Sequence, residues 1–191
     1  PYEIASSMGF SKQDWDIYRN TVGNIESGNK YDIAGGSGNH YDGRWQLGAA
    51  AKTDAASYLG ENDPGHGAAA REKYRKDADM QERYFAAFTA KNHSYLSGTP
   101  EYDRLSTKEK FEVLGYAHNQ GAGGARAWLQ SGEVRADGFG TKATKYSEAL
   151  NAAYSSAGNN TVVKRQKGGM IPTLLEPGES VFGPGQYDSS I

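Results

Sequence analysis

Apolar side chains recur at helical spacing along most of the first 154 residues, and this pattern predicts a mainly α-helical domain. The clearest stripe consists of Trp15, Tyr18, Val22 and Ile25, which fall on one face of a helix. The chain shows no internal repeat. Further helices are predicted over residues 46–59, 68–96 (with a break near 77–79), 106–120, 125–129 and 141–154.

Small and polar residues predict where the first helix begins and ends. Ser11, with Asp14 three positions later, is typical of a helix N-cap followed by an acidic first turn. Gly28 fits the C-terminal stop of the same helix. Residues 28–43 contain five Gly, two Asn and two Asp, which predicts a loop with short extended pieces around 31–34. A loop of this length in a compact domain is often functional.

The pattern changes after residue 155. The stretch SSAGNNTVVKRQKGG is small and polar and then basic, which predicts a linker, and its KRQK run is interpreted as a solvated charge cluster. From residue 168 to 182, Pro and Gly recur too often for a continuous helix. The sequence therefore predicts a folded domain over residues 1–155 and a linker and tail over residues 156–191.

Composition and charge narrow the classes of function. The net charge of −2 provides no basic footprint for nucleic acid, so no nucleic-acid partner is expected. The chain has no Cys, which excludes disulfides, thiol catalysis and Cys-ligated metals. No apolar run reaches the roughly 18 residues of a membrane span, and no secretory signal is visible. The chain begins at Pro1, which we interpret as the start of a fragment or a processed product.

Three short motifs and one tyrosine stand out in order along the chain. They are ESG at residues 26–28, GRWQL at residues 43–47, AHNQGAG at residues 117–123, and Tyr146. Each is common by itself, and a glutamate on the flank of an apolar stripe is most often a solvent-side carboxylate. Together and in this order they resemble the soluble lytic transglycosylases and their goose-lysozyme-like relatives. The resemblance is closest to the muralytic domains carried by phage virion proteins.

The resemblance implies a lysozyme-like helical fold over roughly residues 15–150, with a single catalytic acid. Glu26 matches the family's acid/base. Ser27 matches the residue that supports that carboxylate and the neighbouring loop. Tyr146 is the best match for a late tyrosine near the acid, and Tyr154 is an alternative.

Four further residues are expected to bind substrate on the same grounds. Gln46 matches an amide that binds an N-acetyl group or a sugar hydroxyl, and Asn119 matches an asparagine that lines the cleft. Two positions depart from the family motifs. Trp45 stands where the family usually has Met, and His118 stands where it usually has Tyr. Both are flat or apolar groups that could still contact a sugar, although His118 could instead be a structural hydrogen-bonding residue.

The implied reaction is cleavage of the β-1,4 bond between N-acetylmuramic acid (MurNAc) and N-acetylglucosamine (GlcNAc) in peptidoglycan, with a 1,6-anhydro product. Most glycosidases use two carboxylates. Asp32, Asp42 or Asp54 could therefore approach Glu26 and make the protein a hydrolase instead. A third alternative is a structural virion module without activity. No metal and no organic cofactor are expected, because the four His lack ligand spacing.

The C-terminal segment GGMIPTLLEPGESVF resembles a segment of phage tail tape-measure and related virion proteins. A flexible Gly/Pro tail is the alternative interpretation. The resemblance implies a virion protein that acts in the periplasm or cell wall of the host. Its expected partners are the glycan strands of peptidoglycan and, through residues 156–191, other phage virion proteins.

Overall fold

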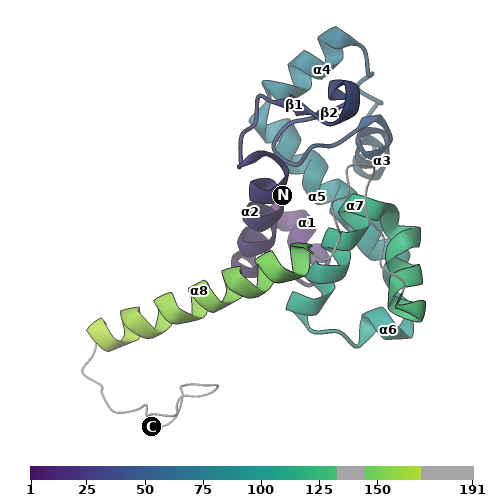
Figure 1. Cartoon of the computed structure of the whole chain (residues 1–191). Coiled ribbons are helices and arrows are strands. Elements are labelled where there is room, and N and C mark those ends of the chain that lie inside the picture. Colours follow the sequence, from purple (N-terminus) through teal and green to yellow (C-terminus); the bar gives the residue numbers. More distant parts are fainter. Residues whose placement is uncertain (133–144, 169–191) are drawn as a thin grey trace. The chain divides into compact units, whose positions relative to one another are not determined.

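The computed structural model describes residues 1–132 and 145–168 of the chain, and this part is mainly α-helical, as the pattern predicts. Two two-residue strands, β1 (Ala34–Gly35) and β2 (Tyr41–Asp42), pair antiparallel on either side of a single 3-10 turn, Ser37–Asn39. The helices are α1 (Tyr2–Ser7), α2 (Lys12–Ser27), α3 (Ala49–Leu59), α4 (Ala68–Arg75), α5 (Ala78–Leu96), α6 (Pro100–Asp103), α7 (Thr107–Ser131) and α8 (Lys145–Gly168) (Figure 1).

Helix α2 begins and ends where the sequence predicts. The hydroxyl of Ser11 accepts a hydrogen bond from the backbone N–H of Asp14, 3.1 Å away. Gly28 terminates the helix in the left-handed conformation, with φ of 65°. Trp15, Tyr18 and Val22 are fully buried, whereas Ile25 at the end of the stripe is partly exposed.

The loop after α2 is more ordered than predicted. Its strands lie at 34–35 and 41–42, so the extended pieces expected around 31–34 overlap β1 at Ala34 alone. The chain then turns back, and Asp42 forms an isolated bridge with Leu47. The turn holds Gln46 at φ of 51°, a left-handed conformation that a regular α-helix does not contain. Helix α3 therefore begins at Ala49 rather than at residue 46.

The predicted break near residues 77–79 is confirmed. The carboxylate of Asp77 accepts a hydrogen bond from Met80 N at 2.9 Å and caps α5, which separates it from α4. Near the end of α5, Tyr95 is 47% exposed. The two short helices α1 and α6 were not predicted, since each is too short to show a periodic stripe.

Helix α7 begins with a capping box, in which Ser106 and Glu109 each bind the other's backbone N–H. It is bent at Gly121, whose φ of 82° and ψ of 159° are not helical. The break predicted at the glycines is therefore present, but the expected short helix at 125–129 is the second part of α7 and extends to Ser131.

Helix α8 corrects the predicted linker. It runs from Lys145 to Gly168, so residues 155–167 are helical and the helix does not end at Tyr154. The stretch contains no proline, and its Val, Lys, Arg and Gln residues are all compatible with a helix. The predictions for residues 169–191, the tape-measure-like segment included, lie outside the described residues.

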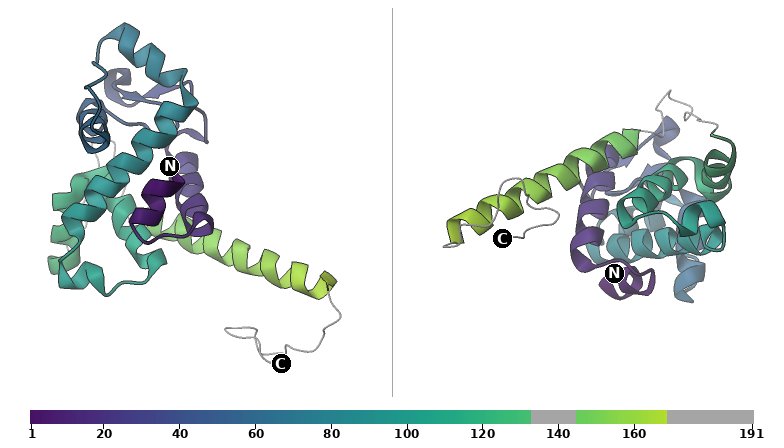
Figure 2. Two further views of the ribbon diagram at one scale, coloured as in Figure 1. Left: turned by 180° about the vertical axis from the view of Figure 1, so that it is seen from behind. Right: turned by 90° about the horizontal axis from the view of Figure 1, so that it is seen from below.

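The chain divides into two units, Pro1–Leu150 and a second that begins at Asn151. Within the first unit, α5 packs against α3 and α7 and also touches α1 and α4 (Figures 1 and 2). Stacked aromatic rings fill the core of this unit. Tyr18 lies 4.6 Å from Phe111, and Trp45 lies 4.6 Å from Phe85, both pairs nearly parallel. None of the described helices is long and apolar enough to cross a membrane.

Candidate functional site

The first residues of α8, which belong to the first unit, contact α2 at Glu26. This residue lies in the last turn of α2 and is partly exposed. The hydroxyl of Tyr146, on α8, donates a hydrogen bond to Glu26 Oε2, and the Tyr146 side chain is fully buried. Gly115 on α7 makes room for that ring, because a Cβ there would lie only 2.9 Å from Tyr146 Cβ. The predicted acid and the predicted late tyrosine, 120 positions apart, are thus in direct contact.

Ser27 connects the end of α2 to the GRWQL turn. Its hydroxyl lies 2.7 Å from the carbonyl oxygen of Arg44, to which it donates. It also accepts a hydrogen bond from the backbone N–H of Lys30 at 3.0 Å. The turn after α2 and the GRWQL turn are therefore held together next to Glu26, a geometry that agrees with a supporting role for Ser27.

Arg44 is a buried anchor that the sequence reasoning missed. Its guanidinium donates to Asn20 (2.6 Å), Asn29 (2.9 Å) and Glu82 (3.1 Å), and its backbone N–H donates to the side chain of Gln81 (2.8 Å). These contacts fix the GRWQL turn against α2 and α5. The one signal in the sequence was the position of this arginine between Gly43 and Trp45 in a motif.

Trp45 is not placed to bind a substrate. Its side chain is 1% exposed, it stacks on Phe85, and its indole N–H donates to the carbonyl oxygen of Arg19 at 2.8 Å. The prediction that Trp45 contacts a sugar is therefore corrected: its indole belongs to the core. A large apolar ring gains more from burial than from exposure, and the core beside α5 accepts it.

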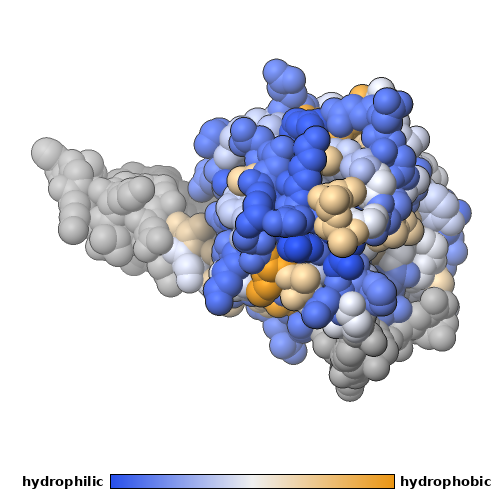
Figure 3. Space-filling model, turned by 90° about the horizontal axis from the view of Figure 1, so that it is seen from above, coloured by the Kyte–Doolittle hydropathy of each residue, from blue (hydrophilic) through white to orange (hydrophobic). Residues whose placement is uncertain are grey.

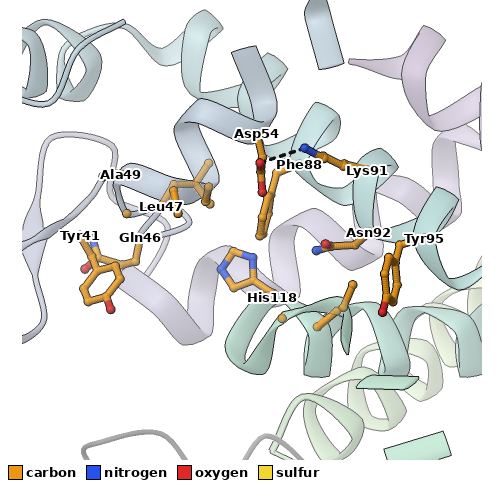
Figure 4. A pocket seen from close by; sticks show the side chains of 16 residues that line it. Tyr41, Gln46, Leu47, Ala49, Asp54, Phe88, Lys91, Asn92, Tyr95 and His118 are labelled. Atoms are coloured by element: carbon orange, nitrogen blue, oxygen red, sulfur yellow. Dashed lines mark hydrogen bonds and ion pairs between the residues drawn. The ribbon is translucent and has the colours of Figure 1, made fainter. Parts of the chain in front are cut away.

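A groove of about 520 Å³ lies beside the GRWQL turn (Figure 4). Gln46 lines one side, where its amide N–H donates to the carbonyl oxygen of Gly43 at 2.9 Å. His118 lies near the middle, and Asn92 and Tyr95 lie at the opposite side (Figure 4). Of the residues predicted to bind substrate, Gln46 and His118 thus share one groove.

His118 has a structural contact as well as a place in the groove. Its Nε2 lies 2.8 Å from the carbonyl oxygen of Trp45, and because a carbonyl only accepts, Nε2 must carry the proton. Its ring meets Phe85 and Phe88 edge to face, at 5.7 and 5.8 Å. The structural role left open in the sequence is therefore present, and contact with a ligand stays a prediction.

Asn119 does not line this groove. Its side-chain oxygen accepts a hydrogen bond from the amide of the adjacent Gln120, 2.7 Å away, and both residues are partly exposed. The bend of α7 at Gly121 follows directly, so Asn119 lies in the last regular turn before the bend. Its predicted role at a ligand also stays a prediction.

The three aspartates considered as second carboxylates are all engaged elsewhere. Asp42 is fully buried and is bound by Lys52 (2.6 Å), Arg71 (2.7 Å) and Arg75 (3.0 Å). Burial by itself would raise the pKa of Asp42, but the hydrogen bonds from these three cations outweigh it and lower the pKa to about 2. The other two form exposed ion pairs, Asp32 with Arg75 and Lys76 and Asp54 with Lys91.

No protein-family model matches the chain, and no match was found among curated proteins or solved structures. Within the described residues, no cluster of His, Asp or Glu could hold a metal ion. What the site can do chemically follows from its own residues. Glu26 is a half-buried carboxyl group held by a tyrosine hydroxyl, whereas the amide of Gln46 and the imidazole of His118 lie in a groove whose lining does not include Glu26.

Proposed function

We propose that this chain has a lysozyme-like fold and cleaves the β-1,4 bond between MurNAc and GlcNAc in bacterial peptidoglycan as a lytic transglycosylase. The contact between Glu26 and Tyr146 carries the proposal. It joins two residues that the motif resemblance singles out for one site, although they are 120 positions apart in the chain. A carboxyl group that is partly buried and hydrogen-bonded is the kind of group that general acid/base catalysis requires.

Glu26 acts twice in this reaction. As an acid it donates its proton to the glycosidic oxygen, the bond from C1 of MurNAc to that oxygen breaks, and GlcNAc leaves with a free 4-hydroxyl group. As that bond breaks, the N-acetyl oxygen of the same MurNAc forms a bond to C1. As a base Glu26 then takes the proton from the C6 hydroxyl, whose oxygen bonds to C1 as the N-acetyl oxygen leaves. Glu26 ends as the acid again, and no water is consumed.

The engagement of the aspartates favours this one-carboxylate reaction over hydrolysis. An inverting hydrolase needs a free carboxylate about 6.5–9.5 Å from the acid to activate water. Asp42 is neutralised by three cations in a buried cluster, and Asp32 and Asp54 are held in ion pairs. Gln46, which lines the groove with its amide group, is suited to hydrogen-bond an N-acetyl group.

We expect the protein to solubilise purified peptidoglycan without increasing the number of reducing ends. The ring closure consumes C1 of MurNAc, so no new hemiacetal appears. Turbidity and a reducing-sugar assay on the same digest measure the two quantities. A rise in reducing ends in step with the loss of turbidity would assign the protein as a hydrolase, and an unchanged turbidity would favour the inactive virion module.

We expect Tyr146→Phe to lower the rate of wall cleavage by about 10–100-fold, because a hydrogen bond to a charged group contributes roughly 1.5–3 kcal/mol. The ring stays, so the melting temperature should change little. Tyr58→Phe is the matched control, since it removes an exposed hydroxyl from α3. Wild-type rates for Tyr146→Phe would show that its hydroxyl does not position Glu26.

The proposal includes delivery by a phage particle, which rests on the resemblance of residues 168–182 to tape-measure segments. A truncation after Ser156 would cut through α8, so the test is a chain that ends at Gly168. This truncated chain should cleave peptidoglycan at the wild-type rate. When it replaces the full chain during particle assembly, the purified particles should not contain it. Particles that incorporate the truncated chain normally would contradict the role of the tail.

A further inference from the structure

A second pocket, of about 360 Å³, is lined mainly by basic groups. His40, Lys52, His66 and Arg71 line it and no acidic residue does, although the carboxylate of Asp63 contacts His66 Nε2 at 3.0 Å. We call it the basic pocket. It adjoins the groove beside the GRWQL turn, because both are lined by Tyr41 and by the residues at the start of α3. The surrounding face, over α4 and the β1–β2 pair, is largely hydrophilic (Figure 3).

The charges around this pocket do not balance. Asp42 behind it carries one negative charge, whereas Lys52, Arg71 and Arg75 carry three positive charges. Arg75 shares the exposed Asp32 with Lys76, so that carboxylate adds no net negative charge to the group. Neutralising Asp42 needs only one of its three cations, and a positive surplus remains next to the pocket even when the carboxylate of Asp63, which contacts His66, is counted.

Two of the cations retain unused donors. Arg71 binds Asp42 through Nε and Nη2 and the carbonyl oxygen of Asn39 through Nη2, whereas its Nη1 finds no acceptor within the described residues. Lys52 is 2% exposed and makes one hydrogen bond, to Asp42, with its ammonium group over the ring of Tyr74 at 4.4 Å. An ammonium group has three N–H donors, so further capacity remains.

The pKa of Lys52 reflects this crowding. Burial lowers it first, contact with Asp42 opposes that effect, and the positive charges of Arg71 and Arg75 lower it again. An anion that entered the pocket would offset the repulsion among these cations and would accept charge-assisted hydrogen bonds from them. The backbone N–H groups at the start of α3, which has no side-chain cap, add further donors.

We propose that the basic pocket binds a carboxylate of the peptide that the glycan substrate carries. The presence of an anion site follows from the side chains of the pocket, whereas the identity of the ligand rests on the proposed function. A peptide attached to a MurNAc in the groove could reach the pocket, because the two share Tyr41, Gly48 and Ala49. Phosphate groups of wall polymers carry similar chemistry, and the test separates these two sources.

The first arm uses inorganic phosphate as a simple anion, titrated into the protein at constant ionic strength and followed by amide chemical shifts. We expect saturable shifts at the residues of the basic pocket, with chloride producing none. Ala49→Glu should weaken binding by about tenfold or more, since it places a carboxylate at the mouth of the pocket. Ala49→Gln, of matched size without the charge, should stay within about twofold of wild type.

Ala49 suits this test because it is exposed and is the first residue of α3, where an acidic side chain favours the helix. Loss of binding in Ala49→Glu therefore does not reflect unfolding. Absence of saturable shifts in the wild-type protein, or equal binding by the two variants, would overturn the anion site.

The second arm identifies the source of the anion. The probe is a GlcNAc-MurNAc tetrapeptide, which has no MurNAc–GlcNAc bond and so is not cut, with its carboxylates free or converted to amides. The free form should bind at least fivefold more tightly than the amidated form, a difference of about 1 kcal/mol in binding free energy. It should also shift the same amide resonances as phosphate does. Equal binding of the two forms, or tighter binding of a phosphodiester polymer, would overturn the assignment to a peptide carboxylate. Because both arms measure binding alone, they stand even if the protein cleaves no glycan.

Discussion

Glu26→Gln should lower the rate of peptidoglycan cleavage by about 10²–10⁴-fold and leave the fold intact, because it removes the only proton donor and acceptor that the proposed reaction uses. A glutamine is the same size as the glutamate it replaces. Its side-chain oxygen can still accept the hydrogen bond from Tyr146, so the contact between α2 and α8 is kept. Initial rates of turbidity loss on purified peptidoglycan, with circular dichroism to verify folding, measure both halves of this expectation.

The matched control for Glu26→Gln is Glu72→Gln, which removes one carboxylate from the exposed side of α4. This variant should cleave peptidoglycan at the wild-type rate. If folded Glu26→Gln protein clears the wall as fast as Glu72→Gln, Glu26 is not the catalytic acid.

Asp42→Asn should lower the free energy of unfolding by about 3–5 kcal/mol, since breaking a buried ion cluster leaves uncompensated charges. Lys52, 2% exposed, loses the one carboxylate that it contacts within the described residues, and the partly exposed Arg71 and Arg75 lose their buried partner, although Arg75 keeps the exposed Asp32. In a domain of this size the midpoint of thermal unfolding should fall by roughly 10 °C. Calorimetry at pH 7 measures the change.

The control is Asp54→Asn, which breaks an ion pair with Lys91 at the surface and should cost less than about 1 kcal/mol. The pH dependence gives a second check. The pKa of Asp42 is lowered from 3.8 to about 2, so its contribution is complete above pH 4 and is lost as the pH falls through 2. The stability difference between wild type and Asp42→Asn should therefore shrink over this window, and a difference independent of pH would contradict the ion cluster.

Features that depend on a few neighbouring residues were predictable. Ser11, Gly28 and Asp77 act within three or four positions of a helix end, so their residue types reveal those ends. The contact between Glu26 and Tyr146 was anticipated only through the motif resemblance, because no local pattern relates residues on α2 and α8.

Features that depend on three-dimensional packing were missed. The partners of Asp42 lie 10, 29 and 33 positions away, and nothing near Asp42 in the sequence points to them. Trp45 was assigned to a ligand through the motif resemblance, and its burial was missed because it depends on Phe85, 40 positions later. The extension of α8 was missed because small polar residues were given more weight than the absence of proline.

Mass spectrometry of the muropeptides released from purified peptidoglycan tests the central proposal most directly. Wild-type protein should produce new chain ends that are 1,6-anhydroMurNAc, lighter by one water than hydrolysed ends, and Glu26→Gln protein should produce none above background. Hydrolysed MurNAc ends from the wild-type protein, the same products from both proteins, or no products at all would contradict a transglycosylase in which Glu26 is the acid and the base.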